Sequence, residues 1–196
     1  IQDYHLDIKA KGKPKNSTIE WFVRYKCFKY FEVFFIILCI IVSISLSKHL
    51  LLAIPAYLAL KWYNAKLKEL PLIGNVVIAL LCSASLFALS IPYDLSFLQI
   101  AALIFLLTLL RELLKDKEDE KADGLYNYKT LAIILSTNRF ISICVALMLF
   151  VAYVLFLHLK QEPFYLSIGI IACINIIWFI YRQNWKKSSL SIKLLI

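Results

Sequence analysis

Residues 95–110 read LSFLQIAALIFLLTLL, and residues 111–124 continue directly as RELLKDKEDEKADG. The first part holds no charged residue and can cross a membrane once the flanking charged side chains extend toward the interface. The second part keeps charged side chains at helical spacing up to Gly124, a natural C-terminal stop for a helix. We therefore expect one helix that crosses the membrane and continues beyond it.

The composition of the whole chain agrees with a membrane protein. Of its 196 residues, 61% are hydrophobic and 18% are charged. Soluble domains have about 45–50% apolar and about 25% charged residues. These values exclude a disordered chain and argue against a water-soluble enzyme of one domain.

The uncharged stretches of the chain predict six membrane-spanning helices. A helix needs about 20 mostly apolar residues to cross the hydrocarbon, with about 17 as a working minimum. The stretches are residues 33–47, 49–60, 70–93, 95–110, 140–159 and 163–181. The third, fifth and sixth reach this length unaided, and the second contains Pro55, which should kink it. The expected fold class is therefore an all-α, polytopic membrane helical bundle.

The positive charges predict how the bundle is oriented. With six spans, the connections on one side are residues 1–29, 61–69, 111–139 and 182–196. They hold 20 of the 22 Lys and Arg residues, and only Lys48 and Lys160 fall on the other side. Short cytoplasmic loops accumulate Lys and Arg. We therefore expect an integral protein of the cell inner membrane with these loops in the cytoplasm, and the net charge of +9 needs no nucleic acid to explain it.

Four carboxylates share one face of the helix that follows the apolar run of residues 95–110. At about 100° per residue, Glu112, Asp116, Asp119 and Asp123 fall within a face about 60° wide. Like charges at this spacing repel, so a helix keeps them only where something positive neutralises them. This pattern indicates a cation site.

The alternative is a solvated helix at the membrane surface, laced with Lys115, Lys117 and Lys121. Two observations weigh against it. The spacing places these lysines off the carboxylate face, and Asp3 and Asp7 form a second i,i+4 pair in another long connection on the same side. Mg²⁺ binds through a few carboxylates plus waters and phosphates. Two carboxylate groups among Lys and Arg therefore favour a diphosphate bridged by Mg²⁺.

Polar residues also occur within the predicted spans. Asn75, Gln99 and Asn175 lie in otherwise apolar stretches. Such residues commonly form hydrogen bonds between helices. We expect that role for all three of them, in preference to contact with a substrate.

These motifs resemble the UbiA superfamily of intramembrane prenyltransferases. Residues 111–123 with Lys129-Thr130-Leu131 closely match its second aspartate-rich motif, and residues 63–75 resemble the segment between two of its helices. Residues 1–14 resemble an altered first motif, with Gln2 where Asn is usual and Asp7 displaced by one residue. The resemblance covers the whole chain as one transmembrane domain, with the motifs in the loops 1–29 and 111–139. It places the six spans as the third to eighth of nine, so we expect further helices at both ends.

The resemblance implies an enzyme in which two Mg²⁺ ions hold an isoprenyl diphosphate between the two motifs. Ionisation would leave an allylic cation, which an acceptor hydroxyl or aromatic carbon attacks. The catalytic metal ligands would be Asp116, Asp119 and Asp123, with Asp3 and Asp7 as a second set. The diphosphate would be bound by Tyr63, Lys66, Lys68, Arg111 and Lys129.

The second motif is most similar to the branch that transfers a geranylgeranyl group to geranylgeranylglyceryl phosphate. The expected partners are therefore a prenyl diphosphate, a lipid or aromatic acceptor and membrane lipids. One alternative is a quinone-type prenyltransferase that acts on 4-hydroxybenzoate or naphthoate. A second is a non-catalytic homologue that binds a prenyl lipid, suggested by the altered first motif. A transporter is disfavoured because the ionisable residues gather at one end of the spans.

Overall fold

The computed structural model describes residues 50–65, 67, 70–88, 95–125 and 129–196, together with residues 30, 33, 34, 37, 38 and 41. The chain divides into two compact units, residues 1–57 and 58–196. In the first unit, the described residues are helical, and they include part of the first predicted span. No described residue lies in a β-strand, which confirms the all-α prediction.

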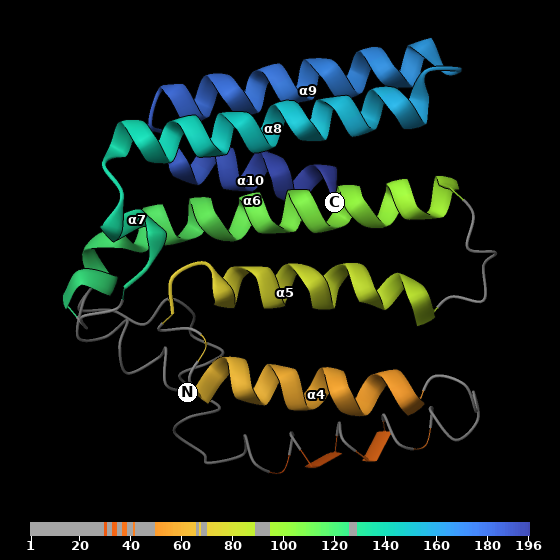
Figure 1. Cartoon of the computed structure of the whole chain (residues 1–196), viewed down its shortest axis with the longest axis vertical. Helices are drawn as coiled ribbons and strands as arrows, with labels where there is room; N and C mark the ends of the chain where they lie inside the picture. The colour runs from red at the N-terminus through yellow and green to blue at the C-terminus, as the bar shows by residue number, and fades with distance from the viewer. Residues whose placement is uncertain are drawn as a thin grey trace. The chain divides into compact units, whose positions relative to one another are not determined.

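Most of the described helices overlap predicted spans (Figure 1). In chain order they are α4 (Leu50–Ala65), α5 (Ile73–Ala84), the 3₁₀ turn η2 (Ser85–Ala88), α6 (Leu95–Leu125), α7 (Leu131–Ile134), α8 (Thr137–Leu159), α9 (Pro163–Tyr181) and α10 (Trp185–Leu195). The second predicted span is confirmed as a helix, and Pro55 lies inside α4.

By length and composition, three of the described helices can cross a membrane, namely Leu95–Lys121, Thr137–Leu159 and Pro163–Tyr181. They match the fourth, fifth and sixth predicted spans. The share of each apolar window that is buried falls from 56% in α6 to 28% in α8 and 17% in α9. Helix α6 packs against α5, α8 and α10, and it is therefore the central helix of the second unit. The outer faces of α8 and α9 leave large apolar side chains exposed, as lipid-facing helices do.

The third predicted span is wrong as a single continuous helix. Residues 70–72 form a turn, α5 has 12 residues, and the chain tightens into the 3₁₀ turn after Ala84. The hydroxyls of Ser83 and Ser85 donate to the carbonyls of Leu80 and Cys82, at 3.0 and 2.7 Å. Serine hydroxyls compete in this way with the helical hydrogen-bond ladder and weaken its continuation. Residues 89–94 lie outside the described part of the chain.

The charged segments of the second unit gather at one end of its helices. Figure 1 shows that the start of α5, the end of α6, the start of α8 and the end of α9 lie at the same end, at the left of the view. This is the alternation that the distribution of Lys and Arg predicts. Helix α10 then runs back alongside α6. It begins at Trp185, within the connection 182–196 that follows the sixth predicted span.

A buried lysine connects the end of α6 to the next two helices. Lys117 is 6% exposed, and its ammonium group donates to Glu120 Oε1 at 2.9 Å and to the carbonyl of Ala132 at 3.1 Å. The ammonium group also lies 5.6 Å from the centre of the Phe140 ring. A buried charge is tolerated only with such partners. These contacts hold α7 and the start of α8 against α6.

The turn between α4 and α5 depends on a close backbone approach at Gly74. A Cβ atom added there would lie 2.9 Å from the carbonyl oxygen of Leu67 and 3.1 Å from Cε2 of Tyr63. The preceding Leu72 has φ 65°, a left-handed conformation that L side chains rarely adopt. The turn is therefore tightly specified, and it sets where the first residues of α5 lie.

We expect Gly74→Ala to destabilise the protein by about 1–3 kcal/mol, because the methyl group would press on backbone that cannot move away cheaply. The matched control is Gly169→Ala, where the added atom would meet only Leu155 Cδ1 at an ordinary 3.5 Å. Thermal unfolding in detergent measures both variants. Equal melting temperatures for the two variants would contradict the prediction.

Candidate functional site

The carboxylate face lies where the central helix leaves its apolar stretch. Helix α6 has 31 residues without a break and is about 46 Å long, whereas the hydrocarbon of a bilayer is about 30 Å thick. Its charged end therefore extends beyond the apolar layer. Because the helix is continuous, Glu112, Asp116, Asp119 and Asp123 lie along one side of it, as the spacing predicts.

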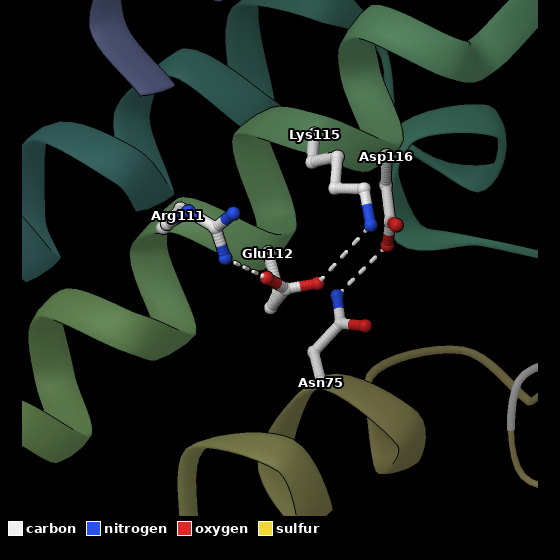
Figure 2. Close-up of polar contacts among 5 residues, drawn as sticks. All are labelled: Asn75, Arg111, Glu112, Lys115 and Asp116. Atoms are coloured by element: carbon white, nitrogen blue, oxygen red, sulfur yellow. Dashed lines mark hydrogen bonds and ion pairs between the residues drawn. The ribbon is translucent and has the colours of Figure 1, made fainter. Parts of the chain in front are cut away.

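An asparagine of the neighbouring helix holds the Asp116 carboxylate. The Nδ2 atom of Asn75, on the first turn of α5, donates to Asp116 Oδ2 at 2.8 Å (Figure 2). Asn75 is 9% exposed, so this contact is shielded from water. The predicted role of Asn75 as a hydrogen-bonding residue between helices is confirmed, and its partner is a predicted site residue.

Asn75 is not among the site residues that the sequence predicts. A signal was present, because Asn75 ends the segment 63–75 that carries the resemblance and lies at the end of its span where the carboxylates gather. Its pairing with Asp116 required the structure, since the two residues are 41 positions apart.

Glu112 is neutralised by two cations on its own helix. Arg111 Nη1 donates to Glu112 Oε1, and Lys115 Nζ lies 3.8 Å from Glu112 Oε2 (Figure 2). The expectation that the lysines lie off the carboxylate face is therefore wrong for Lys115. Its i,i+3 spacing from Glu112 lets the long side chain reach back by one turn. Lys117 is directed away from this face, toward Glu120 and α7.

Tyr63 lies next to the turn that leads into α5. The ring of Tyr63 lies beside Gly74, the neighbour of Asn75.

Lys129 is exposed at the start of the segment leading into α7. It lies next to Thr130, whose buried hydroxyl has no hydrogen-bond partner within the described part of the chain. Asp3, Asp7, Lys66 and Lys68 lie outside the described residues, so their predicted roles stay predictions.

A divalent metal fits the donors that this face offers. Among the described residues, no three Asp, Glu, His or Cys side chains lie close enough together to form a complete metal site. Mg²⁺ does not need one, because it binds through one or two carboxylates and fills its other positions with waters and substrate phosphates. Asp116, Asp119 and Asp123 are hard oxygen donors on one side of α6. Their roles as metal ligands stay predictions.

The other two polar residues within spans give a mixed result. Gln99 Oε1 and His158 Nδ1 are 3.1 Å apart, and this hydrogen bond joins α6 to α8 as predicted. Asn175 instead donates to the carbonyl of Ile171, one turn earlier in its own helix, at 3.1 Å. Within the described part of the chain the prediction for Asn175 is wrong, because its side chain lies on an exposed face of α9 and bonds to its own helix.

The chain is similar in sequence to several known prenyl-transferring enzymes. Digeranylgeranylglyceryl phosphate synthase of Saccharolobus solfataricus is 29% identical over 180 residues, which cover 89% of this chain and 62% of the relative. The synthases of Pyrococcus horikoshii and Methanoregula boonei are 31% and 42% identical over 71% and 42% of this chain, and over 52% and 31% of their own lengths. The chain thus spans less than two thirds of these relatives.

No solved structure matches the chain significantly. A family model does match, and it covers nearly the whole sequence, from residue 2 to residue 195. This match includes the carboxylate face, its asparagine partner and the apolar helices around them. The chain therefore belongs to the UbiA prenyltransferase family.

Proposed function

We propose that the protein transfers a geranylgeranyl group from its diphosphate to geranylgeranylglyceryl phosphate, at the cytoplasmic face of the membrane and with Mg²⁺. The observation that carries the proposal is the second aspartate motif on α6, next to an apolar bundle and among basic side chains. The names of the relatives support this choice of acceptor. The concentration of Lys and Arg at this end of the helices supports its cytoplasmic side.

The reaction breaks the bond between the allylic carbon and the diphosphate, and it forms a bond from the same carbon to the acceptor oxygen. The diphosphate leaves with the electron pair of the broken bond, and the proton of the acceptor hydroxyl passes to the released diphosphate. Bound Mg²⁺ would supply charge neutralisation that makes the diphosphate a better leaving group. Asp116, Asp119 and Asp123 would hold the metal.

The basic side chains of this end have the complementary task. Arg111 lies at the boundary between the apolar and charged parts of α6, and its pairing with Glu112 restricts its motion. It would bind the diphosphate together with Lys129, Lys66, Lys68 and the hydroxyl of Tyr63. Charges fixed before the reaction stabilise developing charge with little reorganisation. The apolar side chains of the bundle would keep water from the prenyl chain and the reacting carbon.

Substitution of the aspartates tests the site. We expect Asp116→Ala and Asp119→Asn to lower product formation by at least about 100-fold, because each removes charge that would hold the metal and diphosphate. The measurement is incorporation of labelled geranylgeranyl diphosphate into lipid by membranes that contain the full-length protein.

The matched control for these variants is Glu118→Gln. Glu118 is a carboxylate of the same helix that lines a surface hollow beside the turn between α9 and α10, with Arg182 and Asn184. It lies away from the carboxylate face, and its removal should leave the rate within about 2-fold, as expected of a surface substitution. Unchanged activity in both aspartate variants would refute the assignment of the site.

Removal of the metal tests the cofactor. EDTA should abolish the labelled product, and excess Mg²⁺ should restore it, because carboxylates alone would repel the diphosphate. Product that persists in EDTA would contradict the metal dependence. If the wild-type protein releases diphosphate only when an aromatic acid replaces the lipid acceptor, it is a quinone-type enzyme. Binding of the prenyl diphosphate without release would identify a non-catalytic homologue.

A further inference from the structure

Two carboxylates one turn apart on α6 are treated differently by their surroundings. Glu112 is 8% exposed and is paired with the cations Arg111 and Lys115. Asp116 instead receives a hydrogen bond from the neutral amide of Asn75 (Figure 2). An ion pair cancels the charge of a carboxylate, whereas an amide donor orients the group and leaves its charge in place. Glu112 is therefore an ion-paired carboxylate, whereas Asp116 is a carboxylate oriented by a neutral donor.

The hydrogen bond from the Asn75 amide reaches one particular oxygen of Asp116. Asn75 donates to Oδ2, which leaves both lone pairs of Oδ1 and one of Oδ2 for further partners. Asn75 itself is fixed, because it is buried on the first turn of α5 and follows Gly74, where the backbone approaches Leu67 closely. Asp116 therefore need not lose rotational freedom when it binds a ligand.

The geometry points to Asn75 as a positioning residue. It keeps Asp116 oriented as a ligand for the Mg²⁺–diphosphate, while Arg111 and Lys115 hold Glu112 in ion pairs. This inference rests on the proposed function and adds to it a residue on another helix. Residues that orient a metal ligand in this way typically change metal affinity or activity by about 10–100-fold when they are lost.

The experiment compares two variants of the full-length protein in detergent. Asn75→Leu removes the donor and keeps the approximate volume. The exchange variant, Asn75→Asp combined with Asp116→Asn, retains a hydrogen bond between the two helices but moves the carboxylate from α6 to α5. The probe is Mn²⁺ with geranylgeranyl S-thiolodiphosphate, a slowly reacting analogue. Binding is followed by electron paramagnetic resonance, and stability by thermal unfolding.

We expect Asn75→Leu to weaken Mn²⁺ binding by about 10–100-fold. The exchange variant should regain the melting temperature of the wild type and should not regain Mn²⁺ binding. The loss of Mn²⁺ binding in the exchange variant tests Asp116 as the ligand. A purely structural role of Asn75 predicts instead that Asn75→Leu lowers the melting temperature and leaves Mn²⁺ binding of the folded protein unchanged. If Asn75→Leu fails to fold, Asn75→Gln, which keeps a neutral amide but moves it by one methylene, gives the same comparison of Mn²⁺ affinity with melting temperature.

The matched control is Gln99→Leu, which removes the other interhelical hydrogen bond, the one to His158. It should lower the melting temperature and leave Mn²⁺ binding unchanged. Mn²⁺ binding by Asn75→Leu at the wild-type affinity, in a protein that makes product, would overturn the role of Asn75 alone. A wild-type protein that makes no product and binds no Mn²⁺ would overturn the proposed function and this inference with it.

Discussion

Repulsion between carboxylates at the end of α6 is the constraint on which the site depends. The same helix must be apolar enough to cross the membrane and then carry four acidic side chains on one face within about three turns. Each acidic group needs a partner that offsets its charge or its loss of water. Arg111 and Lys115 supply one for Glu112, and Asn75 supplies one for Asp116. The packing of α5 on α6 therefore also supplies the hydrogen-bond donor that the Asp116 carboxylate needs.

The helices packed against α6 hold the residues that contact it in narrowly defined positions. Gly74 lets the start of α5 approach the preceding turn, which sets the position of Asn75. On another side of α6, the buried Lys117 anchors α7 and the start of α8 through Ala132 and Phe140. Neighbouring lysines of one charged segment thus have separate tasks. Lys117 holds the fold together, and Lys115 compensates a carboxylate of the site.

The sequence predicts the long helices well because their signal is local. The sixth predicted span, residues 163–181, coincides with α9, and the charged end of α6 stops at Leu125, next to the expected Gly124. The third predicted span fails because an uncharged stretch need not be helical along its whole length. Hydropathy does not register the hydroxyls of Ser83 and Ser85, which bond back to the chain and accompany the change to a 3₁₀ turn.

The sequence by itself determined the class of fold, the end of the bundle where charge gathers and the shared face of the four carboxylates. All three follow from spacing along the chain, which a helix converts directly into geometry. Only the tertiary structure decided which carboxylate is neutralised and which is held by a neutral amide. Asn75 and Asp116 are 41 residues apart, and their contact depends on how two helices pack. The spacing of residues along one helix carries no information about a partner on another.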